Sequence, residues 1–552
     1  MKGEVIVSDY ASAYADFSLS AAYSVLSGGG KRPLNAAIEC CDRWCGDGRI
    51  ALRWASEDGR RSEHSFEDLR AASSRMAHLL VSLGVGPGDR VGGLLPRTPD
   101  LLTTILATWR IGAVYQPLFT AFGPKPIEHR LLTSQAKVVV TDPGNRGKLQ
   151  GLENLATIVV TQPCVNGLET DVNLAEQLPL RSTDFEPVLR SLDDPFLMMF
   201  TSGTTGPAKP LLVPLKAIAA FVGYMRDAVD LRPDDRFWNI ADPGWAYGLY
   251  YAVTGPLAMG HTTLLFNGAF SVQNAVRIIR ELEITNLAGA PTAFRLLVAA
   301  GVEPLRPIVG KLRAVSSAGE ALNPEVGRWF AENLKVRILD HYGQTELGMV
   351  VCNHHALTHP VTPGSAGFPV PGHRVVVLDD EGTEVPPHVP GTLSVDALRS
   401  PLFWFAGYEG RGQARVDRYY RSGDVVERNE DGSISFVGRA DDVITSSGYR
   451  IGPFEVESAL IEHPAVAEAA VIGKPDPQRT EIVKAFVVLN KGRGGSPALA
   501  LELQEHVKLR LSAHSYPREV EFVDELPKTP SGKIQRFLLR EQEKNRITPR
   551  TA

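Results

Sequence analysis

An apolar run that passes directly into a glycine- and hydroxyl-rich turn constrains this chain more than any other feature. Residues 196–200 have the length and composition of a buried strand. In residues 201–209, which follow at once, two glycines let the backbone turn so that several N–H groups point into one concavity. Hydroxyl groups add donors and Lys209 adds positive charge. This pattern predicts a loop that binds phosphate, with a triphosphate as its natural ligand.

The residues that we expect to face phosphate are Thr201, Ser202, Gly203, Thr204, Thr205, Gly206 and Lys209. The loop differs from that of the common mononucleotide ATPases and GTPases, which needs a lysine followed directly by serine or threonine. Here Lys209 is followed by Pro210. Because a polar turn after a strand also occurs as an ordinary connection, the loop indicates a phosphate site without fixing the class of protein.

Length and charge narrow the class. A chain of 552 residues is long enough for roughly three or four folding units and a cleft between them. The 58 Lys and Arg against 63 Asp and Glu give a formal charge of -5, so no overall positive charge recruits nucleic acid or an anionic membrane. Five cysteines favour a reducing compartment over a disulfide framework, and charged residues interrupt the N-terminal stretch where a secretory signal would be apolar. We therefore expect a cytoplasmic globular protein.

One long stretch, residues 243–276, contains no Asp, Glu, Lys or Arg. Glycines, prolines and polar side chains interrupt it, so it offers no run of about 20 apolar residues to span a bilayer. We expect no membrane span there, and instead the buried floor of a pocket.

Apolar, β-rich runs alternate with helical patterns between about residues 64 and 345, which is typical of a layered α/β core. The expected strands are 137–141, 262–266 and 336–340, and the expected helices are 216–229 and 275–283. After about residue 360, turn-forming residues at 379–382 and 429–432 predict β-hairpins. Beyond Asp442, short strands and helices predict a compact α+β unit.

Three further groups of motifs follow the phosphate loop. They are YGQTELGM at 342–349, then YRSGD, GRADD and SSGYRIG between 420 and 452, and PKTPSGKIQR at 527–536. In this order and spacing the four motifs resemble the adenylate-forming superfamily of acyl-CoA synthetases, peptide-synthetase adenylation domains and luciferases. The resemblance covers about residue 34 to about residue 540.

The resemblance implies an α/β fold with a large N-terminal domain, residues 1–440, in which about 360–440 form a β-rich subdomain. A small, mobile α+β lid, residues 441–552, follows. It also implies a reaction in which a carboxylate and ATP give acyl-AMP and pyrophosphate, and the thiol of coenzyme A then takes the acyl group and releases AMP. A carboxylate is a poor acyl donor until AMP makes it a mixed anhydride. ATP, Mg²⁺ and coenzyme A are therefore expected.

The first step brings anions together, so it needs positioning and charge neutralisation more than proton transfer. In similar enzymes, the residue matching Glu346 holds Mg²⁺ and that matching Thr345 donates to the α-phosphate. Asp424 matches the carboxylate that takes both ribose hydroxyls, and Arg439 an arginine near ribose and phosphate. The remaining residues predicted at the nucleotide are Gly319, Glu320, Asp340, Tyr342, Gly343 and Gln344.

Lys533 matches the family lysine that bridges carboxylate and α-phosphate oxygens and stabilises charge during adenylation. Asp441 matches the hinge about which the lid rotates between the two half-reactions. The residues predicted to serve coenzyme A are Ser447, Gly448, Tyr449 and Arg450. Because adenylation would depend on the charge of Lys533, a lysine acetyltransferase would switch it off and a deacetylase would restore it.

Residues 241–266 and 446–460 look like the acetyl-CoA and medium-chain acyl-CoA synthetase branch. Acetate-specific members carry a tryptophan at the place of Gly343, which closes the acyl pocket. The predicted pocket residues are Trp245, Ala246, Tyr247, Ala318 and Gly343. A glycine at 343 also suits a turn, so it has two interpretations. We favour a short-to-medium-chain or branched acid over acetate, with an aryl acid such as benzoate as competitor.

The phosphate loop departs from the family pattern, because its proline has moved by one position and the closing glycine is absent at Pro210. Its donors and Lys209 remain, so activity is expected. Two rivals stay open: an enzyme that passes its acyl group to a separate carrier protein, and a non-catalytic binding protein on the same scaffold. The sequence leaves open the exact acid and whether the chain forms a homo-oligomer.

Overall fold

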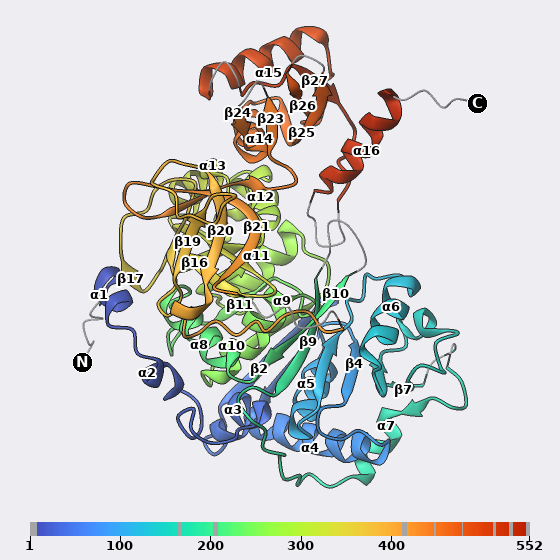
Figure 1. Ribbon diagram of the computed structural model, residues 1–552. Helices are drawn as coiled ribbons and strands as arrows, with labels where there is room; N and C mark the ends of the chain where they lie inside the picture. The colour runs from blue at the N-terminus through green and yellow to red at the C-terminus, as the bar shows by residue number, and fades with distance from the viewer. Residues whose placement is uncertain are drawn as a thin grey trace.

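The computed structural model describes residues 8–163, 165, 167–201, 208–410, 417–446, 449–476, 479–511, 515–528 and 534–547. The body of the molecule contains two large sheets with helices packed on them, and a smaller unit built from the C-terminal residues stands at the top of Figure 1.

The first large sheet has seven strands in the order β10-β9-β5-β4-β6-β7-β8, parallel except for the antiparallel pair β9 and β10. Its strands are β4 (Arg90–Leu94), β5 (Val114–Pro117), β6 (Val138–Thr141), β7 (Thr157–Val160), β8 (Val172–Asn173), β9 (Pro195–Thr201) and β10 (Lys209–Pro214). The helices of this region are α4 (Phe66–Ser82), α5 (Pro99–Arg110), α6 (Pro124–Ser134) and α7 (Leu174–Gln177). A capping box between Ser65 and Asp68 starts α4.

The second large sheet has ten strands in the order β11-β13-β14-β15-β16-β18-β22-β21-β20-β19. They are β11 (Phe237–Asn239), β13 (Asn286–Gly289), β14 (Ala314–Ala318), β15 (Ile338–Gln344), β16 (Gly348–Cys352), β18 (Ser365–Pro369), β19 (Val375–Leu378), β20 (Gly391–Asp396), β21 (Tyr419–Arg428) and β22 (Ile434–Arg439). The strands from β11 to β15 are parallel, and every later pairing is antiparallel. One sheet thus joins the predicted layered α/β core to the predicted β-hairpins.

The helices beside this sheet are α8 (Ala217–Asp227), α9 (Ala246–Gly248), α10 (Gly255–Ala258), α11 (Val272–Glu281), α12 (Pro291–Ala299) and α13 (Pro324–Trp329). The uncharged stretch predicted to form a pocket floor contains α9, a buried π-helical segment (Leu249–Thr254) and α10. None of the helices in the described part of the chain is long and apolar enough to cross a membrane.

Smaller elements complete the body. A three-stranded sheet contains β2 (Ile50–Ser56), β3 (Arg61–Ser65) and β12 (Thr263–Asn267). Near the N-terminus, β1 (Ser8–Asp9) pairs with β17 (Leu357–Thr358), and three short helices follow: α1 (Tyr10–Ala15), α2 (Leu19–Tyr23) and α3 (Ala36–Cys40).

The C-terminal unit is a five-stranded sheet with three helices and its own apolar core, which includes Ile444, Val471 and Leu503. Its elements are β23 (Ile444–Ser446), β24 (Tyr449–Ile451), α14 (Pro453–Ile461), β25 (Val466–Asp476), β26 (Thr480–Leu489), α15 (Pro497–Arg510), β27 (Glu519–Phe522) and α16 (Arg536–Ile547). The mixed α/β fold with a large N-terminal and a small C-terminal part confirms the predicted fold class.

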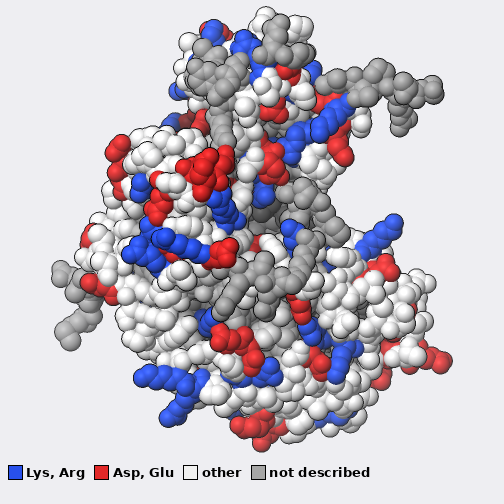
Figure 2. Space-filling view, viewed as in Figure 1, with Lys and Arg blue, Asp and Glu red and all other residues white. Residues whose placement is uncertain are grey.

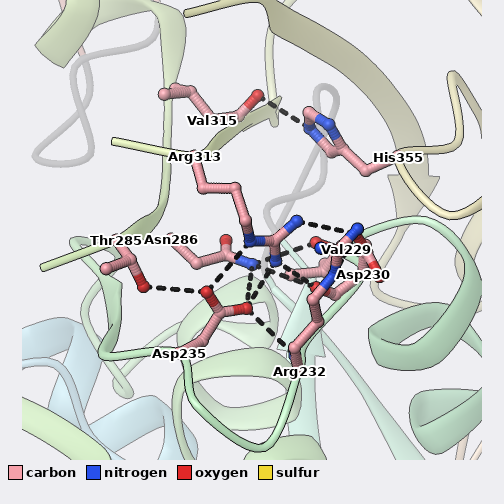
Figure 3. Close-up of polar contacts among 9 residues, drawn as sticks. All are labelled: Val229, Asp230, Arg232, Asp235, Thr285, Asn286, Arg313, Val315 and His355. Atoms are coloured by element: carbon pink, nitrogen blue, oxygen red, sulfur yellow. Dashed lines mark hydrogen bonds and ion pairs between the residues drawn. The ribbon is translucent and has the colours of Figure 1, made fainter. Parts of the chain in front are cut away.

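A cluster of paired charges ties the amino ends of β13 and β14 to the chain that follows α8 (Figure 3). Arg313, just before β14, bonds Asp230 at 2.6 Å and Asp235 at 2.5 Å. Asn286, at the start of β13, donates to the carbonyl of Val229 at 3.1 Å. Burial alone would raise the pKa of Asp235, but the hydrogen bonds from Arg313 and neighbouring donors hold it below its usual value. We name these residues the strand-base cluster.

On the face drawn in Figure 2, basic and acidic side chains are interspersed over the body and the C-terminal unit and do not gather by sign. No broad patch of one charge therefore covers the part of this face that is drawn in colour.

Candidate active site

The predicted phosphate loop joins two antiparallel strands. Thr201 ends β9 and lies directly opposite Lys209, which begins β10. The residues between them that were predicted to face phosphate, namely Ser202, Gly203, Thr204, Thr205 and Gly206, lie outside the described residues. The strand before the loop agrees with the apolar run at 196–200, whereas the strand after it, β10, was not predicted from the sequence.

Strand β15 separates two chemically different surfaces. Tyr342 and Gln344 both contact Asp424, which comes from β21 in the antiparallel part of the sheet. The preceding residue, His341, faces the other way, since its side chain contacts Tyr224 of α8. We call these the nucleotide surface and the acyl surface. The predicted strand at 336–340 thus runs on to Gln344, through the motif itself.

Asp424 lies at the centre of the nucleotide surface and is buried. One carboxylate oxygen accepts hydrogen bonds from the Tyr342 hydroxyl at 2.6 Å and the Gln344 amide at 2.8 Å. Arg439, its register partner on β22, approaches the other oxygen at 3.5 Å. Burial and the Asp424 charge raise the pKa of Tyr342 well above its usual value, so Tyr342 remains a neutral donor. A carboxylate at this position offers acceptor oxygens, which suit a pair of hydroxyls.

Glu346 occupies the turn between β15 and β16 and is buried. Its Oε1 accepts a hydrogen bond from the Tyr408 hydroxyl at 2.5 Å, and the Lys209 ammonium lies 5.2 Å from the centre of the Tyr408 ring. Burial raises the pKa of Glu346, and the Tyr408 hydrogen bond opposes that shift. The carbonyl of the adjacent Thr345 accepts from the Tyr250 hydroxyl at 3.0 Å, which fixes the turn.

A magnesium ion fits this corner as a partner of one carboxylate. The described residues contain no group of three or more His, Cys, Asp or Glu side chains able to hold a metal. Mg²⁺ is commonly held by one or two carboxylates together with substrate phosphates, and Glu346 offers a hard oxygen donor next to the phosphate-loop strand. Bound Mg²⁺ would act as a Lewis acid and neutralise phosphate charge beside Glu346.

Asp340 lies deeper on the nucleotide surface, at the edge of a cavity of about 300 Å³ lined also by Leu322, Asn353 and Gly364. Its Oδ2 accepts from the Leu322 backbone at 3.2 Å, while its buried Oδ1 has no hydrogen-bond partner. Burial raises the pKa of Asp340 to about 8. A buried polar atom without a partner is costly, so this oxygen is suited to a ligand donor.

Two further residues predicted at the nucleotide, Gly319 and Glu320, directly follow β14. Gly319 adopts a left-handed backbone (φ 98°), and open space surrounds the position of a Cβ there. The Glu320 carboxylate accepts from Thr292 at 2.9 Å and pairs with Arg295 at 3.0 Å, both on α12. The side chain of Glu320 is thus occupied within the protein.

On the acyl surface, a chain of hydrogen bonds joins Tyr247, Tyr224 and His341. The His341 Nε2 lies 2.9 Å from the Asn353 carbonyl, which only accepts, so Nε2 carries the proton. His341 Nδ1 therefore accepts from the Tyr224 hydroxyl at 2.8 Å, and Tyr224 accepts from Tyr247 at 3.4 Å. Burial holds the pKa of His341 well below its usual value, which keeps the chain neutral.

Gly343 has no room for a side chain. A Cβ there would lie 2.1 Å from the Gly348 carbonyl oxygen across the turn. This backbone therefore requires glycine at 343 for the turn itself. Whichever reason applies, no side chain projects from position 343. Ala318 is buried and Ala246 half-buried. Trp245 packs between Phe119 and Phe122, each 5.5 Å away between ring centres.

The predicted catalytic lysine, Lys533, lies outside the described residues, as do Ser447 and Gly448. Of Tyr449 and Arg450, the backbone forms part of β24. The base of the Lys533 loop is closed by a bridge between Lys528 and Ile534 and by a 2.8 Å hydrogen bond from the Gln535 N–H to the Pro527 carbonyl.

The predicted hinge, Asp441, pairs with Arg439 of β22 at 3.0 Å. The next residue, Asp442, pairs instead with Arg536 and Arg540 of α16. The side chains of two consecutive residues therefore pair with the large and the small part of the molecule respectively, while the Asp442 N–H donates to the Arg439 carbonyl at 2.9 Å.

Tyr408, Tyr224 and His341 were not among the predicted site residues. Tyr224 has a signal in the sequence, because it falls within the predicted helix 216–229, whose apolar face must be buried, and a buried tyrosine hydroxyl needs a partner. Tyr408 offers no comparable local signal, because its partner Glu346 is 62 residues away.

Comparison with known proteins identifies the class of this protein. Residues 41–402 match the family described as AMP-binding enzyme, and residues 455–533 match the AMP-binding enzyme C-terminal domain. The chain is 37% identical to the acetyl-coenzyme A synthetase of Bacillus subtilis over 99% of this chain and 97% of that protein. It is 35% identical to the mouse (Mus musculus) mitochondrial acyl-coenzyme A synthetase ACSM3 over 92% of this chain and 90% of that protein.

Among solved structures, an acyl-CoA synthetase from Brucella canis is similar, with 58% identity, a TM-score of 0.79 and coverage of 98% of this chain and 100% of that chain. The chain belongs to the AMP-binding enzyme family. It is an AMP-forming acid–CoA ligase, and such enzymes use ATP, Mg²⁺ and coenzyme A.

Proposed function

We propose that this ligase activates short-to-medium-chain or branched carboxylic acids in preference to acetate. The observation that carries the proposal is the shape of the acyl surface. No side chain fits at Gly343, and Ala246 and Ala318 present only methyl groups. No side chain larger than a methyl group therefore projects from these three positions to restrict the acid to two carbons, and Tyr247, hydrogen-bonded to Tyr224, would bound the longer acids.

Each group of residues on the nucleotide surface would have a separate role in adenylation. Thr201, Lys209 and the loop between them would surround the β- and γ-phosphates, and Thr345 would donate to the α-phosphate. Asp424, held by Tyr342 and Gln344, would accept the ribose hydroxyls. Supporting this assignment, Gln344 bonds Asp424 next to the turn that holds Glu346, and Tyr408 contacts both Glu346 and Lys209.

The remaining roles belong to the small C-terminal part. Lys533 would stabilise the charge that develops as the carboxylate attacks the α-phosphorus. Rotation at Asp441 would then withdraw it and bring Ser447, Gly448, Tyr449 and Arg450 towards the thiol acceptor. Acetylation of Lys533 would remove its charge, and unchanged pyrophosphate release from fully acetylated enzyme would contradict that role.

The test is pyrophosphate release and acyl-CoA formation with ATP and Mg²⁺ across acetate, propionate, butyrate, isobutyrate, hexanoate, octanoate and benzoate, each with and without coenzyme A. Acyl-CoA from the propionate-to-octanoate range, lost in Lys533→Ala, would support the proposal. A maximum at acetate or benzoate would overturn the acid assignment. Pyrophosphate release without acyl-CoA would point to a carrier protein as the acyl acceptor.

A further inference from the structure

Tyr408 contacts both of the charged groups predicted to hold the metal-bound nucleotide. Its hydroxyl donates to Glu346 Oε1 at 2.5 Å, and its ring faces the Lys209 ammonium at 5.2 Å. A tyrosine hydroxyl supplies one donor, and here it is given to the carboxylate, whose remaining lone pairs stay available to a cation. The ring and the hydroxyl thus serve different partners.

The backbone on which Tyr408 stands is fixed to the phosphate-loop strand. Tyr408 forms a β-bridge with Leu211 of β10, and the Glu409 N–H donates to the Pro210 carbonyl at 2.9 Å. The Glu409 side chain pairs with Arg90 of β4 at 2.6 Å. Tyr408 is therefore carried by the seven-stranded sheet, whereas Glu346 belongs to the ten-stranded sheet.

We propose that Tyr408 is a positioning residue that sets Glu346 in register with Lys209 across the two sheets, so that one metal–nucleotide complex meets both. The proposal rests on the role proposed above for Glu346. It assigns no contact between Tyr408 and the reacting atoms. A buried carboxylate that loses its donor would turn towards another partner or towards solvent, and its oxygen would then no longer face the phosphates.

The experiment measures binding without turnover. The probe is Mn²⁺ with α,β-methylene-ATP, whose α–β linkage cannot be cleaved, titrated calorimetrically into the full-length protein and repeated with the nucleotide alone in EDTA. Tyr408→Phe retains the ring over Lys209 and removes only the hydroxyl. Its Kd for the Mn²⁺ complex should rise about 10-fold, as expected when a group that orients a metal ligand is lost. Binding in EDTA should stay within twofold of wild type.

A double-mutant cycle separates positioning from a merely structural role. If Tyr408 acts through Glu346, adding Tyr408→Phe to Glu346→Gln should cost no further Mn²⁺-dependent affinity. Tyr419→Phe is the matched control, because Tyr419 also approaches a carboxylate, Glu384 at 3.5 Å, on the outer part of the β-rich region. That variant should bind the probe like wild type.

Three results would overturn the proposal. They are unchanged or tighter Mn²⁺-complex binding in Tyr408→Phe, an equal loss in EDTA, and additive losses in the double mutant. Tighter binding would mean that the hydroxyl competes with the metal, and an equal loss in EDTA would mean that it acts on the nucleotide. If the wild-type protein is folded but does not bind the Mn²⁺ complex, the proposed function itself fails, which is a distinguishable outcome.

Discussion

The two ends of the parallel strands in the ten-stranded sheet use polar residues in opposite ways. At the amino ends, the strand-base cluster matches each buried charge with a partner, as Arg313 does for Asp230 and Asp235. At the carboxyl ends, Asp340 keeps one buried oxygen without a hydrogen-bond partner, and burial raises the pKa of both Asp340 and Glu346. The first pattern stabilises the fold, whereas the second keeps binding capacity that only a ligand completes.

The largest expected effect tests the carboxyl ends. Glu346→Gln keeps the size of the side chain and removes the charge that would hold Mg²⁺. We expect the adenylation rate to fall about 100- to 1,000-fold, or roughly 3–4 kcal/mol, with little change in melting temperature. Pyrophosphate release under saturating ATP measures it. A rate within threefold of wild type would remove Glu346 from the metal site.

The next effect tests the amino ends. Asp235→Asn leaves Arg313 and Thr285 facing a neutral group in a largely buried setting. The free energy of unfolding should fall by about 3 kcal/mol, while kcat at permissive temperature stays within twofold. Denaturant titration measures the loss, and Glu303→Gln, in the exposed pair with Arg306, is the control expected to change stability by less than about 0.5 kcal/mol. Equal losses in both variants would contradict the buried role of the cluster.

A smaller effect concerns pH. Because the pKa of Asp340 is raised to about 8 in the folded protein, the folded state keeps a proton that the unfolded state releases near pH 4. The stabilisation that comes from this proton is fully present below about pH 4. It is lost as the pH rises towards 8, and the free energy of unfolding falls by up to about 1.4 kcal/mol per pH unit. Ligand-free Asp340→Asn should lose less stability than wild type between pH 5 and 7.5. Parallel curves would show that Asp340 is ionised.

The smallest effect probes the acyl surface. Tyr247→Ala should raise the octanoate-to-butyrate ratio of kcat/KM about 5- to 10-fold, because roughly 1 kcal/mol is at stake for each added contact in such a pocket. Ala246→Leu should move the ratio the opposite way. If both variants change all acids by the same factor, these residues lie outside the acyl pocket.

The sequence motifs pointed to the residues of the proposed nucleotide surface because these residues lie in short runs. Gln344, Thr345 and Glu346 are consecutive, and the YRSGD run supplied Asp424. The alternation that predicted the α/β core also held, since local apolar periodicity reports which face is buried. Strand order followed no such rule, because pairing joins distant segments, as when β18 meets β22.

What the sequence could not predict depends on contacts between distant residues. Tyr408 meets Glu346 across 62 positions, and Arg313 meets Asp230 across 83. Gly343 had two interpretations until the approach of Gly348 across the turn showed that a side chain cannot fit. In each case, the deciding quantity is a distance between segments that no local pattern encodes.

The side chains of Asp441 and Asp442 pair with different parts of the molecule, and this affects how the small part could turn. Asp442 forms ion pairs with Arg536 and Arg540 of α16, and Arg536 forms a second ion pair with Glu457 of α14. Asp441 forms an ion pair with Arg439 of β22. The backbone N–H groups of Asp442 and Val443 also donate to the Arg439 carbonyl, each at 2.9 Å, so the proposed rotation would have to break or bend these hydrogen bonds. In the rotation proposed above, the base of the Lys533 loop, closed by the bridge between Lys528 and Ile534, would turn together with the small part.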